Sequence, residues 1–296
     1  MPKKTKDLKG TSAKKAKVGG FVAELEKLLQ GLPGQATGAS IAAIRKTRLA
    51  LEQAATQFVK AAEGLDSIKT PSTVFDPSNP KLVGRFIALA LIAQDRVPIS
   101  SIDRFYGAGI YAIYYNGPYE AYRMIQGSEH PIYVGKADPD INEARTPRDQ
   151  GVKLWGRLNE HAKSIGKTKL SLGDFECRFL VVASGYQKSA EEYLINLFKP
   201  IWNNEVNLVF GIGKHGDSAK TRSNKRSPWD TLHPGRKWAA ATSSDQRSAA
   251  DIEKALAAHF KSTKPYTSRE DIFSRFMSDM RQLPTISSSS SDVSGS

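Results

Sequence analysis

The sequence of 296 residues contains a single cysteine, Cys177. One thiol excludes a disulfide within the chain and a multi-cysteine zinc site, and it is typical of a reducing compartment. Long apolar stretches are also lacking, since the longest run, from Phe86 to Ala93, is far too short to cross a membrane. The N-terminal residues are basic without a following apolar segment, so no signal peptide is expected. These features predict a cytoplasmic protein without a membrane partner.

Acidic residues are too few to balance the basic ones, and the formal net charge is +13. Residues 1–20 carry seven Lys against one Asp, and residues 211–238 carry seven Lys and Arg against two Asp, so these segments contribute most of the excess. Such concentration favours a polyanionic partner, most simply nucleic acid. For residues 1–20, a solvated and flexible arm is an equally good interpretation.

Hydrophobic periodicity predicts helices at both ends of the chain and a mixed centre, in the order strand, strand, helix, strand, helix. The expected strands are 109–115, 131–135 and 175–182, and the expected central helices are 154–165 and 187–198. Further helices are expected at 22–32, 40–65, 80–94, 248–260 and 269–280. The fold class is therefore α/β (α+β), with a small three-stranded antiparallel or mixed sheet flanked by helices and with helical additions at both ends.

Shifts in composition divide the chain into six predicted parts. They are a basic flexible arm (1–20), a helical N-terminal region (21–104), a central module (105–204) with an insertion at 138–153, a basic segment (205–240), C-terminal helices (241–283) and a disordered Ser-rich tail (284–296). The basic segment is expected to be irregular, with Trp229 and Trp238 anchoring it to the core.

The strand GIYAIYY at 109–115 has two unusual features, an initial glycine and three tyrosines within five positions. Glycine weakens a strand, so Gly109 is expected to let the backbone bend or approach another strand and leave room for a phosphate. The following Asn-Gly pair favours a tight hairpin turn. A tyrosine on a strand is usually a core residue, and this interpretation is given to Tyr114 and Tyr115.

Five sequence elements occur in one order: GIY at 109–111, YVGKA at 133–137, RLNEH at 157–161, a glutamate in EEYLI, and an asparagine in KPIWNN. With YVG in place of YIG, they resemble the GIY-YIG nuclease family over about a third of the chain. The resemblance implies a nuclease module whose site residues are Tyr111, Tyr133, Lys136, Arg157, His161, Glu191 and Asn203.

The resemblance gives these residues roles that their chemistry supports. Arg157 and His161 are four residues apart and face the same side of one helix, where a guanidinium suits a phosphate. Lys136 and Arg157 are expected to lower the pKa of a phenol from its usual value near ~10, so that it can activate a water molecule. The choice among Tyr111, His161 and Lys136 as the general base stays open.

A metal-binding carboxylate is expected from Glu191 or Glu192, and the spacings to Pro200 and Asn203 match the family only for Glu191. One carboxylate implies one divalent cation, Mg²⁺, with mostly water and phosphate ligands. Asn203 either ties the helix end to the site, contacts the substrate, or is a plain helix-exit residue.

The insertion at 138–153 and the basic segment at 207–238 resemble the restriction enzymes of this family that cut CCGCGG. This branch implies a type II restriction endonuclease that acts on palindromic double-stranded DNA as a homodimer, or as a tetramer. Expected DNA contacts are Lys214, His215, Arg222, Lys225, Arg226 and Arg236. The alternatives are a homing or DNA-repair nuclease, a non-catalytic DNA-binding protein on the same scaffold, and a structural nucleic-acid interaction protein that binds through its arm.

Overall fold

The computed structural model describes residues 20, 22–31, 38–65, 68, 75–141, 143–213 and 225–281. The chain separates into two compact units, Met1–Thr70 and Pro71–Ser296. Residues 1–19 of the predicted arm and the whole of the predicted tail lie outside the described residues. None of the described helices is long and apolar enough to cross a membrane.

The first unit contains a helix at residues 22–30 and the helix α2, Ile41–Leu65. The sequence predicts both helices, and α2 begins one residue later than expected. No residue of α2 is buried. The apolar side chains of this helix are therefore exposed or, at Ala54, half-buried.

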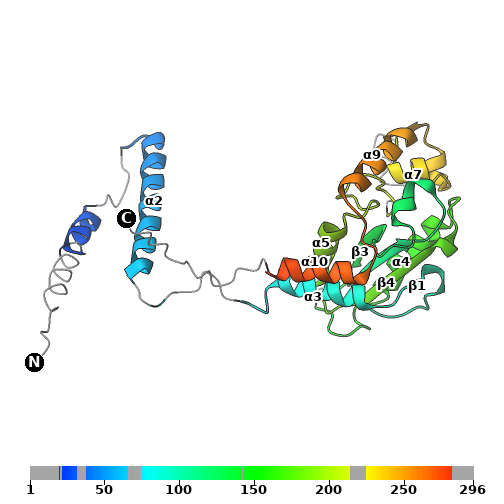
Figure 1. The fold of residues 1–296 in the computed structure, drawn as a ribbon, viewed down its shortest axis with the longest axis horizontal. Coiled ribbons are helices and arrows are strands. Elements are labelled where there is room, and N and C mark those ends of the chain that lie inside the picture. Colours follow the sequence, from blue (N-terminus) through cyan, green and yellow to red (C-terminus); the bar gives the residue numbers. More distant parts are fainter. Residues whose placement is uncertain are drawn as a thin grey trace, which may run out of the picture. The chain divides into compact units, whose positions relative to one another are not determined.

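The second unit is built on an antiparallel four-stranded sheet in the order β1-β4-β2-β3 (Figure 1). The strands are β1 (Val97–Pro98), β2 (Gly109–Tyr115), β3 (Tyr133–Ala137) and β4 (Phe175–Val181). The predicted fold class is confirmed, with the sheet antiparallel throughout. Strand β3, expected at 131–135, begins two residues later than predicted. The two-residue edge strand β1 is an addition that the sequence did not predict.

Helices cover both faces of the sheet, and every residue of β2 is therefore buried. The odd-numbered residues of β2 pack in one cluster with Leu154 and Leu158 of α4 (Lys153–Ile165). The even-numbered residues pack with Leu91 of α3 (Pro80–Ala93) and Leu194 of α5 (Gln187–Phe198). Alternation along one strand thus divides the core into two clusters. Tyr114 and Tyr115 both belong to this core, as predicted.

Gly109 permits the close approach of two strands. A Cβ atom at this position would overlap the carbonyl oxygen of Leu180 on β4. The expectation that Gly109 brings the backbone close to another strand is confirmed, whereas the expected room for a phosphate is wrong, because the backbone of β4 fills that space.

The Asn116-Gly117 pair does not form the tight hairpin that the sequence favours. Asn116 instead bonds to the neighbouring strand region, through its backbone N–H to the carbonyl of Asp174 and its side chain to Glu176. The chain then passes through η2, Glu120–Ile125, before β3 begins. Tertiary contacts across the sheet override the local turn preference.

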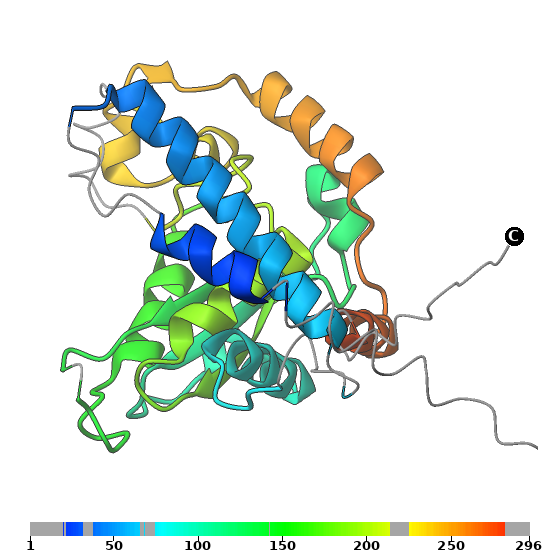
Figure 2. The same ribbon diagram turned by 90° about the vertical axis from the view of Figure 1, so that its left-hand side faces the viewer.

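Further elements complete the second unit, and the basic segment is partly regular instead of irregular. They are η1 (Ile99–Ser101), η3 (Leu172–Asp174), β5 (Lys225–Arg226), α7 (Pro228–Leu232), α8 (Lys237–Ala240), β6 (Ser244–Asp245), α9 (Ala249–Ser262) and α10 (Arg269–Arg281). Helix α10 lies along α3 (Figure 1), and α9 runs beside η2 (Figure 2). Residues 225–281, the described part of the chain after Gly213, therefore fold back onto the sheet module.

Candidate active site

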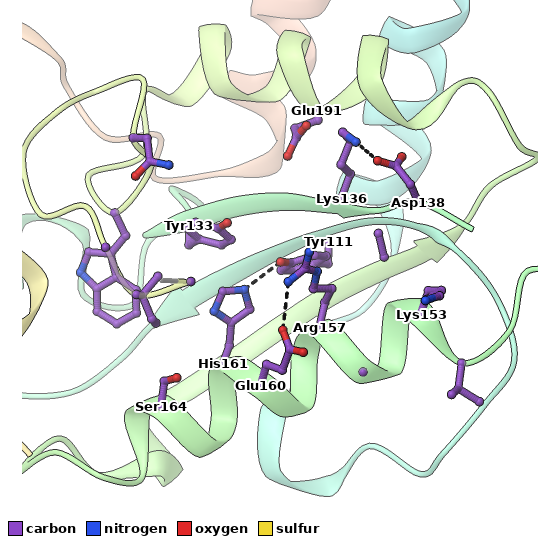
Figure 3. A pocket seen from close by; sticks show the side chains of 18 residues that line it. Tyr111, Tyr133, Lys136, Asp138, Lys153, Arg157, Glu160, His161, Ser164 and Glu191 are labelled. Carbon is purple, nitrogen blue, oxygen red and sulfur yellow. Dashed lines mark hydrogen bonds and ion pairs between the residues drawn. The ribbon is translucent and has the colours of Figure 1, made fainter. Parts of the chain in front are cut away.

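A cleft of about 700 Å³ opens beside the edge strand β3. Helix α4 forms one side and α5 the other, with β2 and β3 between them (Figure 3). Six of the seven predicted site residues line it: Tyr111, Tyr133, Lys136, Arg157, His161 and Glu191. Because β3 is the outer strand, side chains from helices on opposite faces of the sheet reach the same space.

Tyr111 and His161 form a buried pair at the bottom of the cleft. The Tyr111 hydroxyl lies 2.7 Å from Nε2 of His161, and Figure 3 shows the contact as a dashed line. Burial, together with the nearby charge of Arg157, lowers the pKa of His161 to about 3. The imidazole is therefore neutral at pH 7, and with its proton on Nδ1 it accepts the phenolic proton at Nε2.

Tyr133 completes an aromatic cluster, with its ring centroid 4.7 Å from that of His161 and 6.0 Å from that of Tyr111. Burial raises the pKa of Tyr133 to about 12 and raises that of Tyr111 well above its usual value. The positive charge of Arg157 acts in the opposite direction on both phenols and is outweighed. The expectation of a lowered phenol pKa is therefore wrong, because desolvation of these rings exceeds the effect of the cations.

The glycine of the YVGKA motif, Gly135, stands at a position where a side chain would not fit. It lies opposite Tyr111 in the β2–β3 ladder. A Cβ atom here would come within 2.5 Å of the Tyr111 hydroxyl and 2.9 Å of the Tyr133 ring. Absence of a side chain thus leaves room for the Tyr111 side chain across β3, toward His161.

Arg157 lies at the mouth of the cleft, on the same face of α4 as His161, as the spacing predicts. About half of its side chain is exposed (52%), and its guanidinium pairs with Glu160 at 3.0 Å. The sequence analysis did not single out Glu160, although its i+3 spacing from Arg157 indicates such a pair. An exposed guanidinium with only one carboxylate partner retains donors for a phosphate.

Glu191 faces the cleft from the second turn of α5 (Figure 3). Burial raises its pKa to about 7; Lys136 opposes the shift, and Glu205 and Asp138 add to it. Glu192 is exposed outside the cleft and lies 3.9 Å from Lys188. The structure therefore separates the two glutamates, with Glu191 alone on the cleft side.

The donor chemistry of this position fits a divalent cation held by one carboxylate. Among the described residues, no group of three or more His, Cys, Asp or Glu side chains could hold a metal ion together. A half-buried carboxylate is an oxygen ligand of the kind that Mg²⁺ uses, with water and phosphate completing its shell. Lys136 pairs with Asp138 beside it.

Asn203 is buried behind the cleft and takes the first of its predicted roles. Its side-chain amide donates to the carbonyl of Val134 at 2.8 Å and accepts from the N–H of Val134 at 3.0 Å. Val134 lies between Tyr133 and Gly135. These two hydrogen bonds therefore tie the chain after α5 to the strand that carries the motif.

The predicted DNA contacts have different outcomes. Lys214, His215 and Arg222 lie outside the described residues. Lys225 is exposed, whereas Arg226 pairs with Asp245 at 2.7 Å and 3.1 Å.

Arg236 requires a correction, because the structure buries it instead of presenting it to a ligand. Its guanidinium pairs with Asp230 and donates to the carbonyls of Gly211 and Ile212, and the side chain is 5% exposed. It also lies over the ring of buried Trp229. Arg236 therefore anchors the basic segment, together with the predicted anchor Trp229.

Polar cleft residues that the sequence pattern did not single out include Lys153, Glu160, Ser164 and Asn204. Glu160 and Ser164 follow Arg157 and His161 at i+3 spacing on α4, so the helical period could have found them. Lys153 pairs with Asp140 of the predicted insertion, which contributes to the cleft wall through Asp138 and Val152 as well.

Comparison with known proteins agrees with this geometry. Residues 103–260, more than half of the chain, match the family described as the Eco29kI GIY-YIG domain. No curated protein matches the chain. The matched residues include the whole sheet module from β2 to α5, the cleft and most of α9. The chain therefore belongs to the Eco29kI GIY-YIG family of restriction endonucleases, and a nuclease domain implies DNA as its substrate.

Proposed function

We propose that the protein is a type II restriction endonuclease that hydrolyses both strands of DNA at a palindromic site and depends on Mg²⁺. The observation that carries the proposal is the convergence on one cleft of the Tyr111–His161 pair, Arg157 and Glu191, which come from three different elements. All four residues line the same cleft. The resemblance noted above suggests CCGCGG as the first target to test.

The proposed mechanism assigns the proton transfers to the buried pair. Tyr111 takes a proton from the attacking water while its own proton passes to Nε2 of His161, which is neutral and accepting at pH 7. The transfer places a positive charge on His161, which the lowered pKa of this buried ring opposes, so the step relies on the negative charge of the bound phosphate to stabilise the imidazolium. Tyr133 holds a second hydroxyl in the same cluster for orienting the water.

Arg157 and Glu191 act on the phosphate. The exposed guanidinium of Arg157 neutralises the charge that develops on the phosphate oxygens. Glu191 would hold the cation, and Mg²⁺ when bound would supply a Lewis acid for the phosphoryl transfer. The products are a 5′ phosphate and a 3′ hydroxyl.

Digestion of a mixed-sequence DNA of several kilobases with Mg²⁺ tests this function. The expected result is a set of discrete fragments whose ends, when sequenced, define one palindrome cut on both strands. EDTA is expected to abolish the cutting. A smear, nicks confined to branched DNA, or binding without cutting would instead favour a repair nuclease, a homing nuclease or a non-catalytic DNA-binding protein.

A homodimer is part of the proposal, because a palindrome cut on both strands asks for two active sites related by a dyad. We propose that an apolar stripe along helix α2, called the seam below, packs against the same stripe of a second copy of the chain. Its residues 41, 44, 51, 55, 58, 62 and 65 are apolar at alternating spacings of three and four, interrupted by Arg48, and none is buried. This is the pattern of a helix that packs against a like helix.

Sedimentation velocity of the full chain tests the seam. Leu51→Glu with Phe58→Glu is expected to reduce the mass from two chains to one, because both side chains lie on the apolar stripe. Gln53→Glu with Gln57→Glu adds the same charge off the stripe and should leave the mass unchanged. Equal masses for both double variants would assign the dimer contact to another surface.

A further inference from the structure

A second groove lies beside the active-site cleft, between the C-terminal half of α4 and the start of α8. It encloses about 660 Å³ and is lined by Glu160, Lys163, Ser164, Lys167, Gly235, Arg236, Lys237 and Trp238. Glu160 and Ser164 also line the active-site cleft; Figure 3 shows both on α4, next to Arg157 and His161. The two depressions are therefore adjoining parts of one surface.

The charge of this groove is positive and uncompensated. Lys163, Lys167 and Lys237 are all exposed, and no ion pair of the described residues includes any of them, whereas Lys136 and Lys153 of the neighbouring cleft each pair with an aspartate. The acidic residue that lines the groove, Glu160, is engaged by Arg157. Three ammonium groups thus remain for an anionic ligand.

The walls of the groove are fixed relative to the active site. Gly235 has φ +155°, and a Cβ atom there would overlap the carbonyl of Lys167, so the loop before α8 is pressed against the end of α4. The next residue, Arg236, is buried and donates to the carbonyls of Gly211 and Ile212, which line the active-site cleft. One arginine therefore supports walls of both depressions, which gives the lysines a defined position.

The spacing along α4 fits the repeat of a nucleic-acid backbone. Eight residues separate Arg157 from Ile165, the last residue of α4, a rise of about 12 Å, and Lys167 lies two residues beyond the helix end. Phosphates of one DNA strand follow each other at about 3.4 Å along the helix axis, so this rise corresponds to roughly four base pairs. A backbone that runs along α4 with its scissile phosphate at Arg157 would reach the end of α4, two residues before Lys167, within that length.

We propose that this groove binds backbone phosphates of double-stranded DNA about four base pairs from the scissile phosphate, through Lys163, Lys167 and Lys237. The inference rests on the proposed function and adds the path of the substrate to it. Such contacts hold the duplex in register and carry no sequence information. Lysines near a helix C-terminus also interact favourably with the helix dipole and stabilise the helix. The helix dipole can explain why a lysine stands at position 163, in the last turn of α4. It does not explain Lys237, which belongs to α8.

The test is the full-length triple variant Lys163→Gln/Lys167→Gln/Lys237→Gln, with Lys81→Gln/Lys254→Gln/Lys261→Gln as the control. Both variants lose three positive charges, and the control lysines line neither groove. Binding of a fluorescent 30-base-pair duplex without Mg²⁺ is measured by anisotropy between about 50 and 300 mM KCl, and cleavage is measured at saturating DNA with Mg²⁺. The thermal midpoint of each variant checks folding.

For the groove variant, Kd is expected to rise at least about tenfold at 100 mM KCl. The slope of log K against log salt is expected to fall by about 2.7, the value for three lost phosphate contacts. The control should match the wild type in Kd, in slope and in the rate of cleavage. Equal values of Kd and slope for the groove variant and the control would contradict the proposed DNA-binding role of the groove. The proposed nuclease function would not be affected by that result. A wild type that cuts no DNA, combined with the expected change of slope, would overturn the proposed function while leaving the groove intact.

Discussion

Replacing Glu191 by glutamine is expected to lower the rate of DNA cleavage by at least about a thousandfold and to change the affinity for DNA by less than about threefold. Glutamine keeps the shape of the side chain and removes the charge that holds the cation, so the loss falls on the chemical step. Single-turnover cleavage with Mg²⁺ and equilibrium binding without it separate the two effects. Glu192→Gln is the matched control, since Glu192 points away from the cleft toward Lys188. Its cleavage rate should equal that of the wild type.

The same carboxyl group predicts how Mg²⁺ dependence changes with pH. The pKa of Glu191 is raised to about 7, so the proton and the cation compete for it near neutral pH. Lowering the pH from 8 to 6 should raise the Mg²⁺ concentration for half-maximal cleavage by about tenfold. A Glu191→Gln enzyme that still cuts within tenfold of the wild type would show that the cation is held elsewhere.

Tyr111→Phe is expected to reduce single-turnover cleavage by about 10²- to 10⁴-fold, because it removes the hydroxyl that relays a proton from water to His161 and retains the ring that fills the core. Tyr115→Phe is the control on the same strand. Its hydroxyl is used to accept a hydrogen bond from the backbone N–H of Tyr119. That variant should cut at the wild-type rate and lose about 1 kcal/mol of unfolding free energy.

The pH profile distinguishes a neutral histidine from a titrating one. Since the pKa of His161 is lowered to about 3, its charge does not change between pH 5.5 and 9. At saturating Mg²⁺, cleavage should therefore show no inflection near pH 6.5 that belongs to His161. An acid limb near pH 6.5 that disappears in His161→Gln would contradict the proton relay.

The sequence predicts the elements of the module well because their signals are local. The β-rich run at 109–115 and the amphipathic run at 187–198 have the bounds that periodicity gives them. A four-residue spacing places Arg157 and His161 on one face of α4 without reference to the rest of the fold. The choice of Glu191 over Glu192 rests on the family's spacings to Pro200 and Asn203, and the structure places Glu191 on the cleft side of α5.

Properties that depend on packing were not predictable in the same way. The direction of the phenol pKa shifts follows from how completely α4 and β3 enclose Tyr111, which no local pattern encodes. From the sequence, Arg236 is expected to be a surface cation. In the structure Asp230 and two backbone carbonyls bind its guanidinium in the interior. The turn expected at Asn116 gives way to contacts with β4, which lies far along the chain. The roles of Lys214, His215 and Arg222 stay predictions.

The position of a bound cation tests the central claim most directly, namely that Glu191, Arg157 and the Tyr111–His161 pair act on one phosphodiester. A crystal of the protein with its target duplex, soaked in Mn²⁺ and measured at the manganese edge, provides that position. The expected result is an anomalous peak at about 2.2 Å from a Glu191 carboxylate oxygen and from an oxygen of a phosphate that also contacts Arg157. A peak away from Glu191, or a scissile phosphate outside the cleft of Tyr111, would contradict the account.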